Sequence, residues 1–380
     1  MAVSETTTIG WGSRLGSSLK GILFGLGLFI AGFPLLFWNE GRAVTDTKTN
    51  EEGAASVVEA SAGEVDPSQE GRLVHVVGEA TTQDVLSDGE YGVSATAIRL
   101  TREVEMYQWV EHSETREEKK LGGKVERTTT YSYSRQWCLS PVSSDGFKEQ
   151  QGHVNPPARR ELGTARQYAK NVTIGVRSLN DSQIRSIGGG ERLLVKYQPV
   201  GTNEFFEITG TVPEPRVGDI RVTYTVVRPH VVTVVAAQLG QTFMAYTAKS
   251  TKKQISHVMD GAIDAEGVFA AAERGNRILT WVLRLLGFFI MYRGLKSVLE
   301  PLVVLGDVVP FVGTIVGIGT SVAAFAVAAP CALVTIAVAW LFHRPVVSCV
   351  LLAAAGAIVF LVWKRRRAAK AAAPAAPTAE

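Results

Sequence analysis

Cysteine is scarce in this chain, which has three cysteines among its 380 residues. Cys331 and Cys349 lie inside long apolar segments, which leaves Cys138 as the single cysteine of the polar part. A lone cysteine cannot form a disulfide within that part, so its fold must rest on its own hydrophobic core. No CxxC pair and no Cys/His cluster has the spacing of metal ligands, and we therefore expect no metal site.

Catalytic motifs are also missing. The chain has no nucleophile elbow, no HExxH motif and no glycine-rich loop of the kind that binds phosphate. A catalytic set would have to be built from His75, Glu105, His153 and Asp219, but a lone histidine in a strand is more often structural. We therefore expect no enzymatic activity and no cofactor, and we keep a membrane-bound enzyme as the least favoured alternative.

A basic stripe for nucleic acid is absent too. The formal net charge is +3, and most of the lysines and arginines that create a local bias lie at the ends of apolar segments. Basic residues in those places report how membrane segments are oriented. We expect membrane lipids and other membrane proteins as partners, and no nucleic acid.

The last third of the chain has few charged residues. Residues 281–363 are almost continuously apolar, and residues 308–342 contain no charged residue. As a straight helix, residues 308–342 would extend roughly 52 Å, whereas a bilayer core is about 30 Å thick. We expect this stretch to tilt, fold back or break, with Pro310 and Pro330 as the break points.

A second uncharged run, residues 21–38, lies near the N-terminus and would extend roughly 27 Å as a helix. A cleaved signal peptide usually has a shorter apolar core and a small-residue cleavage site. This run ends instead in bulky residues followed by Asn39-Glu40-Gly41-Arg42, which is typical of an interfacial anchor. We therefore predict a retained span.

Together the uncharged runs predict four transmembrane helices, at residues 21–38, 278–299, 311–342 and 346–363. The predicted segments on one side of the membrane are residues 1–20, a loop at 300–310 and a basic, disordered tail at 364–380. Lys and Arg close to the membrane number nine on that side and five on the other. The positive-inside rule then puts both termini in the cytoplasm.

Residues 39–277 lie between the first two predicted spans and form one large domain on the lumenal, periplasmic or outer side. Its β-branched runs predict mostly strands, with a hairpin turn over the charged residues 111–127. Helical patterns are expected at 158–170, 181–187 and 252–276, and the last leads into the second span. The fold class is therefore α+β: four transmembrane helices and a large β-rich extramembrane domain.

A series of short motifs, in the same order along nearly the whole chain, resembles one known family. The motifs are Asn39-Glu40-Gly41-Arg42-Ala43, Glu70-Gly71-Arg72-Leu73-Val74-His75, Leu86-Ser87-Asp88, Tyr91-Gly92-Val93, Val104-Glu105-Met106-Tyr107-Gln108-Trp109, Tyr131-Ser132-Tyr133, Gly152-His153, Asn155-Pro156, Val217-Gly218-Asp219, Leu283-Arg284 and Arg344-Pro345. The family is transmembrane protein 43, also called LUMA.

The resemblance implies four spans, a large lumenal domain after the first span and cytoplasmic termini, as the charge count does. Animal members of the family look like proteins of the endoplasmic reticulum and the inner nuclear membrane. There they are thought to self-associate and to organise complexes with lamins and emerin. Bacterial relatives exist as well, for which the implied location is the cell inner membrane.

Arg284 is the sharpest single feature, because a charged residue within a span is costly and often functional. One interpretation is an interfacial arginine whose head reaches the membrane surface. The other is a contact to a lipid phosphate, or a buried pair with a carboxylate such as Glu40. The candidate lipid or partner contacts are Glu40, Arg42, Tyr107, Trp109, Arg277, Trp281 and Arg284.

Small residues recur every fourth position in two of the predicted spans. They are Gly21 and Gly25 in the first and Gly313, Gly317 and Ser321 in the third. Small residues at this spacing let helices approach closely, either within the bundle or between copies of the chain. We predict helix packing at these positions, with self-association as the alternative.

Aromatic residues gather on two strands that we expect to be neighbours. They are Tyr107, Trp109, Tyr131, Tyr133 and Trp137. Core packing or cross-strand pairing is the simpler interpretation, and a ligand-binding or partner-binding face is the alternative.

The function that these observations favour is a membrane-anchored scaffold whose spans support a homo-oligomer. A lipid-binding or lipid-responsive membrane protein is the alternative. Bound lipid that depends on Arg284 would favour the second interpretation, and stable homo-oligomers without a bound small molecule would favour the first.

Overall fold

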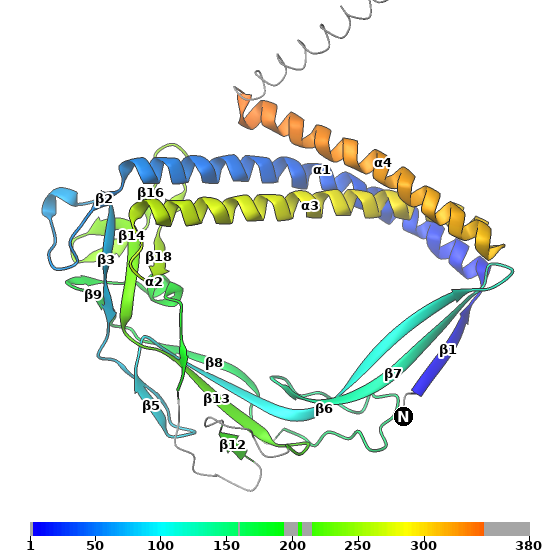
Figure 1. Ribbon diagram of the computed structural model, residues 1–380, viewed down its shortest axis with the longest axis horizontal. Coiled ribbons are helices and arrows are strands. Elements are labelled where there is room, and N and C mark those ends of the chain that lie inside the picture. The colour runs from blue at the N-terminus through cyan, green and yellow to red at the C-terminus, as the bar shows by residue number, and fades with distance from the viewer. Residues whose placement is uncertain (1–2, 159, 194–203, 207–214, 346–380) are drawn as a thin grey trace, which may run out of the picture. The chain divides into compact units, whose positions relative to one another are not determined.

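A computed structural model of the chain describes residues 3–158, 160–193, 204–206 and 215–345 (Figure 1). The described residues divide into two compact units. The β-rich unit draws on residues 3–10, 48–120 and the described part of 124–274, and the helical unit draws on residues 11–47, 121–123 and 275–345.

The helices are α1 (Trp11–Ser56), α2 (Asp181–Ser186), α3 (Ala265–Gly306) and α4 (Pro310–His343), with a short 3₁₀ helix at Pro67–Gln69. The strands are β1 (Val3–Ile9), β2 (Val58–Glu59), β3 (Leu73–Thr81), β4 (Val85–Asp88), β5 (Val93–Thr96), β6 (Arg99–Lys119), β7 (Val125–Cys138), β8 (Gly163–Tyr168), β9 (Thr173–Ile174), β10 (Arg177–Ser178), β11 (Glu191–Arg192), β12 (Glu204–Phe206), β13 (Ile220–Val227), β14 (His230–Leu239), β15 (Thr242–Met244), β16 (Tyr246–Thr247), β17 (Gln254–Ile255) and β18 (His257–Asp260).

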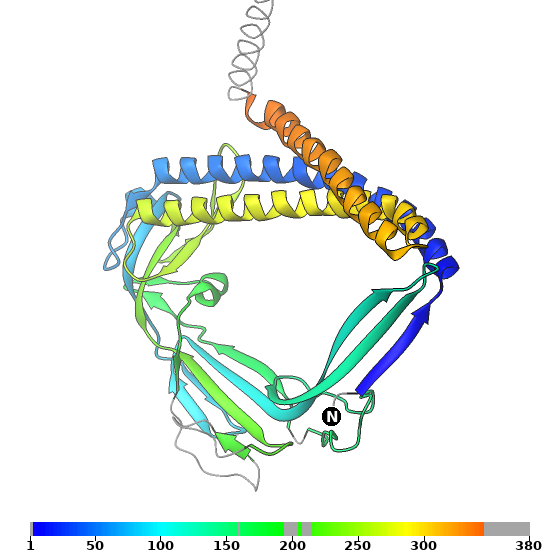
Figure 2. The same ribbon diagram turned by 45° about the vertical axis from the view of Figure 1, so that its right-hand side comes forward.

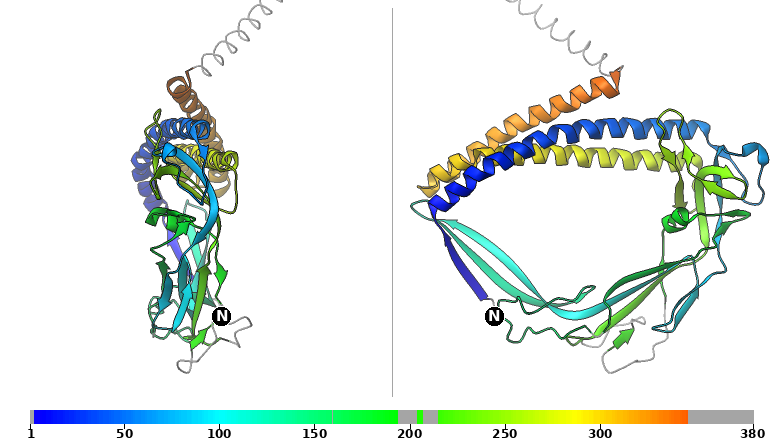
Figure 3. Two further views of the ribbon diagram at one scale, coloured as in Figure 1. Left: turned by 90° about the vertical axis from the view of Figure 1, so that its left-hand side faces the viewer. Right: turned by 180° about the vertical axis from the view of Figure 1, so that it is seen from behind.

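Two seven-stranded sheets account for most of the described strands of the β-rich unit. The first has the order β1-β7-β6-β13-β11, with β8 paired to β6 and β12 paired to β13. The second has the order β18-β14-β15-β10-β9-β3-β2, and β14 also pairs with β3. Figure 3 shows the first sheet continuing into a long arm, in which β1 runs beside the hairpin of β6 and β7. The predicted β-rich region is therefore confirmed.

Burial in both sheets follows the strand pattern. Ile220, Val222, Tyr224 and Val226 alternate along β13, and each is at most 2% exposed. Alternate residues of a strand point to one face, so these four form one side of a hydrophobic core. In the second sheet β14 is buried without interruption over residues 232–238, as expected for a strand that is covered on both faces.

The helix predicted at residues 158–170 is wrong, because this stretch holds strand β8 (Gly163–Tyr168), which pairs antiparallel with β6. Gly163 has a φ of +127°, a value outside the helical region. The prediction for residues 181–187 is confirmed by α2 (Asp181–Ser186). Asn180 and Gln183 form a capping box at its start, which explains why so short a helix begins there.

The helix predicted at residues 252–276 begins later, at Ala265. The first part of the stretch forms β17 and β18, and β18 completes the sheet beside β14. Gly261 then turns the chain with a φ of +88°, and the Asp264 carboxylate accepts a hydrogen bond from the Gly267 amide. Sheet pairing has overridden a local helical pattern here.

The hairpin turn is shorter than the predicted 111–127. β6 continues to Lys119 and β7 begins at Val125, so both strands extend through most of that charged stretch. Gly122 and Gly123 occupy the turn with φ values of +80° and +73°, which glycine adopts without strain.

Strand β1 is the largest departure from the sequence analysis, which had residues 1–20 as a polar N-terminus. Val3–Ile9 pairs antiparallel with β7, from Val3 opposite Tyr131 to Ile9 opposite Val125. The backbone N–H and C=O groups along the edge of β7 are thereby paired with β1.

This pairing makes a direct prediction. Thr6 and Thr128 are opposite each other, with their hydroxyl oxygens 3.2 Å apart. In a chain whose three native cysteines are replaced, Thr6→Cys with Thr128→Cys should form a disulfide under mild oxidation, seen as a mobility shift that reductant reverses. Thr6→Cys with Ser132→Cys is the control, because that pair is offset by about 13 Å along the strand. Equal cross-linking of both pairs, or of neither, would contradict the register.

In the helical unit, three described helices are long and apolar enough to cross a membrane, namely α1, α3 and α4. α1 and α3 extend beyond the predicted spans 21–38 and 278–299. α3 continues through Pro301, so the predicted loop 300–310 shrinks to a turn between Gly306 and Pro310. The predicted fourth span, 346–363, and the tail, 364–380, lie outside the described residues.

α4 extends over the whole of the predicted third span, 311–342, as one helix. Pro310 is its first residue, where the missing backbone N–H does no harm. Pro330 lies inside the helix, so the break expected there does not occur. The part of α4 that is buried consists of small residues: Gly313, Thr320, Ala324, Ala328, Ala332, Thr335 and Ala339.

Glycines bring α1 and α3 into close contact (Figure 2). A Cβ on Gly294 would lie 2.5 Å from the Gly25 carbonyl oxygen and 2.6 Å from the Phe29 amide nitrogen. The Ser297 hydroxyl donates a hydrogen bond of 3.1 Å to the Gly21 carbonyl oxygen. Close backbone approach of this kind is the packing that small residues permit in a membrane.

Gly294→Val should therefore destabilise the helical unit, because backbone atoms on α1 cannot move aside as a flexible side chain could. Overpacking of this kind costs about 1–3 kcal/mol. We expect a lower melting temperature in detergent, followed by size-exclusion chromatography after heating. Gly27→Val is the matched control, since a Cβ on Gly27 meets nothing within 4 Å. Equal melting temperatures for the two variants would show that the close approach does not matter.

Candidate functional site

A band of polar side chains lies inside the helical unit, where α1 and α3 face each other beyond their most apolar segments. We call it the polar seam, and it consists of Asn39, Glu40, Arg42, Asn276, Thr280, Arg284 and Trp340. Asn276, Thr280 and Arg284 follow one another at intervals of four residues, so they share one face of α3. Asn39 and Glu40 are at most 1% exposed.

Glu40 is the centre of the polar seam. Its two carboxylate oxygens accept hydrogen bonds from Arg284, at 2.6 Å from Nε and 2.8 Å from Nη2. The indole Nε1–H of Trp340 donates a third, at 2.8 Å. The three residues come from α1, α3 and α4, so one carboxylate joins all three long helices.

Aromatic rings enclose the guanidinium of Arg284. Its Cζ lies 4.8 Å from the Trp281 ring centroid and 5.9 Å from the Trp340 ring centroid. The face of an indole ring attracts a cation, and the attraction grows when water is excluded. The Arg284 guanidinium therefore contacts the Glu40 carboxylate and the rings of Trp281 and Trp340.

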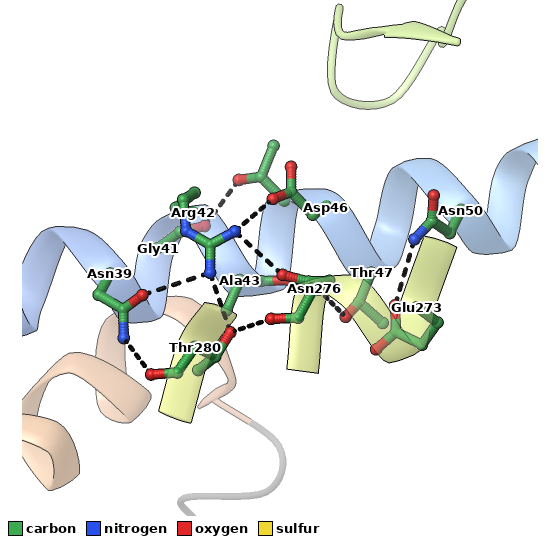
Figure 4. Close-up of polar contacts among 11 residues, drawn as sticks. Asn39, Gly41, Arg42, Ala43, Asp46, Thr47, Asn50, Glu273, Asn276 and Thr280 are labelled. Atoms are coloured by element: carbon green, nitrogen blue, oxygen red, sulfur yellow. Dashed lines mark hydrogen bonds and ion pairs between the residues drawn. The ribbon is translucent and has the colours of Figure 1, made fainter. Parts of the chain in front are cut away.

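Arg42 holds the next turn of α1 to α3 (Figure 4). Its Nη1 donates to Asp46 at 2.7 Å and to the Asn276 side-chain oxygen at 3.1 Å. Its Nη2 donates to the Thr280 hydroxyl at 2.9 Å and to the Asn39 side-chain oxygen at 3.3 Å. Asn276 and Thr280 thus use the same face of α3 as Arg284.

Gly41 explains how α4 reaches the polar seam. A Cβ on Gly41 would lie 2.9 Å from two atoms of the His343 ring, and that ring also packs 5.3 Å from the ring of Phe37. A larger residue at position 41 would displace the end of α4 and with it Trp340.

The energetics of the polar seam depend on complete pairing. Two charges taken out of water lose several kcal/mol of hydration each, and only good geometry with further hydrogen bonds offsets this loss. The Arg284–Glu40 pair has that geometry, and Trp340 satisfies the carboxylate further. Removing one partner would leave the other charged, buried and unpaired, which would strongly destabilise the folded state.

A second ion pair lies elsewhere in the helical unit. Arg14 Nη2 donates to Asp307 Oδ2 at 2.5 Å, and the Asp307 side chain is fully buried. Asp307 occupies the turn between α3 and α4, against Gly313, so the predicted packing glycine at 313 makes room for this carboxylate. Gly317 faces Val303 of α3, at 3.5 Å from its would-be Cβ, and the Ser321 hydroxyl donates within its own helix to the Gly317 carbonyl oxygen.

The remaining candidates named from the sequence lie in different surroundings. Trp281 is 57% exposed, and the exposed side chain of Arg277 makes no hydrogen bond or ion pair to any other described residue. Tyr107 packs 5.2 Å from Trp137, and Trp109 meets His153 edge to face at 4.7 Å. The aromatic rings on β6 and β7 thus make cross-strand pairs and contact the loop that follows β7.

The four residues from which a catalytic set might be built do not share partners. His75 is buried between the Glu59 carboxylate at 2.7 Å and the Ile263 carbonyl oxygen at 2.8 Å. Glu105 is paired with Arg221, and Asp219 accepts from the Arg216 amide. His153 instead stacks on Tyr133 at 4.0 Å, where desolvation and the Glu111 carboxylate raise the pKa of Tyr133 above its ordinary value.

Sequence reasoning missed Asn276, Thr280, Trp340 and Asp307. The spacing of Asn276 and Thr280 ahead of Arg284 was a usable signal, because it predicts one polar helical face. Nothing local marks Trp340 or Asp307, since their partners Glu40 and Arg14 lie about 300 residues away in the chain.

The side chains of the polar seam join helices to one another. Within the part of the chain that the structure describes, no three His, Cys, Asp or Glu side chains are grouped to hold a metal ion. The groups of the polar seam bind one another and hold three helices in register.

Comparison with known proteins identifies the family. The family model described as transmembrane protein 43 matches residues 106–345. The chain belongs to the transmembrane protein 43 family. The rat transmembrane protein 43 is 37% identical over 88% of this chain and 88% of its own length, and the human protein is 35% identical over 97% and 95%.

A more distant relative, the Drosophila melanogaster transmembrane protein 43 homolog, is 30% identical over 89% of this chain and 93% of its own length. No solved structure matches the chain. The resemblance drawn from the short motifs is thereby confirmed, and this member of the transmembrane protein 43 family is an integral membrane protein with apolar helices.

The pairing at the centre of the polar seam predicts a characteristic mutant pattern. Arg284→Leu should lower the free energy of unfolding by about 3–5 kcal/mol, because it leaves Glu40 charged and buried. Glu40→Leu with Arg284→Leu should recover most of that loss, because neither charge remains. The measurement is thermal unfolding in detergent, and exposed Arg277→Leu is the matched control. Additive losses in the double variant would show that the two residues do not act as a pair.

Proposed function

We propose that this chain is a non-enzymatic, multi-pass membrane scaffold that organises complexes of membrane proteins. The observation that carries the proposal is that the charged groups inside the helical unit bind one another. Glu40 accepts hydrogen bonds from Arg284 and Trp340, and Arg42 donates to four acceptors. Groups held in this way fix the positions of helices and are poorly placed to serve as an acid, a base or a lipid ligand.

Self-association is part of the proposal. Gly21, Gly25 and Gly313 contact other parts of the same chain, so a second copy would have to use other positions. A Cβ on Gly12, Gly16 or Gly27 of α1 would meet nothing within 4 Å, and small residues with open space beside them allow a neighbouring helix to approach. A homo-oligomer formed through α1 is consistent with this arrangement.

The partners and the location follow from the family and stay proposals. We propose other membrane proteins and membrane lipids as partners, and no nucleic acid. In a eukaryotic cell the partners would be of the lamin and emerin type, in the endoplasmic reticulum and the inner nuclear membrane, and in a bacterium the location would be the cell inner membrane. We also propose four spans and cytoplasmic termini, from the number of long uncharged runs and the excess of basic residues on one side.

A lipid-binding function is the second candidate, and one observation favours it. Arg277 and Trp281 lie one turn apart on α3, and both are exposed. A cation beside an indole ring at the start of an apolar helix is suited to a phosphate at the membrane surface. The Arg284 guanidinium, by contrast, is already hydrogen-bonded to Glu40.

The two functions can be separated by native mass spectrometry of the detergent-purified protein. We would compare the wild type with Arg277→Leu and with the charge-free pair Glu40→Leu and Arg284→Leu. The scaffold predicts a homo-oligomer in all three proteins, without a lipid that depends on position 277.

A bound lipid that disappears in Arg277→Leu and persists in the charge-free pair would move the assignment to lipid binding. A monomer in all three proteins, without any bound lipid, would remove the support for a self-associating scaffold.

A further inference from the structure

One buried histidine of the β-rich unit joins the segment that follows α1 to the segment that precedes α3. His75 on β3 is 3% exposed, and both nitrogens of its ring have a hydrogen-bond partner. Nδ1 lies 2.7 Å from the carboxylate of Glu59, on the short strand after α1. Nε2 lies 2.8 Å from the carbonyl oxygen of Ile263, just before α3 begins. We call these three residues, all of them in the β-rich unit, the histidine clasp.

The two partners decide which charge the ring must carry. A backbone carbonyl oxygen can only accept a hydrogen bond, so Nε2 of His75 needs a proton. An ionised carboxylate can also only accept, so Nδ1 needs a proton as well. The ring that fits both partners is therefore the imidazolium. After one proton is lost, one nitrogen presents a lone pair to an acceptor, and that contact changes from attraction to repulsion.

Among the described residues, Glu59 is the only ionisable side chain that hydrogen-bonds to His75. His257 on β18 and His75 on β3 both lie opposite Val235 of β14, so the two rings share one face of the sheet. Desolvation lowers the pKa of His257 below its ordinary value, so that ring favours its neutral form. The other ionisable side chains on the elements around His75 are Glu52 near the end of α1, Glu79 of β3, Tyr246 of β16, and Asp264 and Glu266 around the start of α3. Glu52 and Asp264 accept hydrogen bonds from backbone amides instead.

The turn before α3 has a second attachment that does not depend on pH. The Thr233 hydroxyl of β14 donates to the Gly261 carbonyl oxygen at 2.8 Å and accepts from the Ile263 amide at 3.0 Å. A threonine hydroxyl keeps the same charge over the physiological pH range, so this attachment stays when His75 loses a proton. Loss of the histidine clasp therefore loosens residues 57–60 and 261–264 and leaves the sheet itself folded.

We propose that His75 is a pH-sensitive clasp, which holds the segment after α1 and the segment before α3 to the second sheet while its ring is protonated. The clasp is closed at low pH and opens as pH rises through about pH 5–8, the range in which histidine changes charge. The sign follows from linkage, because the closed form binds a ring proton that the open form releases. This response to pH is additional to the proposed scaffold function.

The test is hydrogen–deuterium exchange of the full chain in detergent at pH 5.5 and pH 8.0, with each rate divided by the intrinsic rate at that pH. The Ala60 amide, which donates to the His75 carbonyl oxygen, and the Ile263 amide report the clasp. Peptides from β13, in the other sheet, are the internal control. We expect the protection of both amides to fall about 10- to 100-fold at the higher pH, as for the loss of one charge-assisted hydrogen bond. Protection in β13 should not change.

Glu59→Gln is the decisive variant, and position 59 should tolerate it because the Glu59 side chain is 74% exposed. The glutamine amide can accept from a protonated Nδ1 and can donate to an unprotonated one, so the contact no longer depends on the charge of the ring. We expect this variant to lose the pH dependence and to stay closed at both pH values.

Thr233→Val is the matched control, because it removes the attachment that does not depend on pH. It should lower the protection of residues 261–264 at both pH values and keep the pH dependence of the wild type.

Equal protection of the Ala60 and Ile263 amides at the two pH values in the wild type would overturn the proposal. A full pH response in Glu59→Gln would also overturn it, because the response would then come from another group. Exchange at these amides reports a local opening, so the result does not depend on whether the protein self-associates or acts as a scaffold.

Discussion

The rest of the helical unit depends on one buried carboxylate. Glu40 accepts hydrogen bonds from Arg284 on α3 and Trp340 on α4, so its two oxygens are common to three helices. A charge in this setting is tolerable only while its partners stay in place, which makes the pairing highly selective for one register of α1 against α3. The glycine contacts supply the close approach, and the carboxylate specifies which positions meet.

The contact between α1 and α3 is stabilised by different interactions in its two halves. Near Gly25 and Gly294, backbone meets backbone, and the stabilisation comes from close van der Waals packing. Near Arg42 and Thr280, the same two helices are joined by hydrogen bonds between side chains. α4 uses mostly small residues for its buried face, so it gains its specificity at its two ends, from Asp307 at one and Trp340 at the other.

Much of the local structure could be predicted from the sequence, because local pattern was the relevant constraint. The uncharged runs marked all three described long helices, and a short helix was expected at residues 181–187. Predictions failed where distant partners decided the outcome. Gly163–Tyr168 became a strand because β6 offered a free edge, and Val3–Ile9 became one because β7 did. The Glu40–Arg284 pair could be named in advance from charge and position, whereas Trp340 could not, since an indole in an apolar helix is ordinarily just apolar.

Glu40 and Arg284 are 244 residues apart in the chain, and this separation sets a delay during synthesis. At ribosomal rates of about 5–20 residues per second, Glu40 is made roughly 12–50 s before Arg284. During that interval the carboxylate has neither its guanidinium nor its indole. Until Arg284 is made, the Glu40 carboxylate of α1 must therefore be hydrogen-bonded by water or by another donor. Assembly of the three helices is consequently a late event, completed only when the last of them has been synthesised.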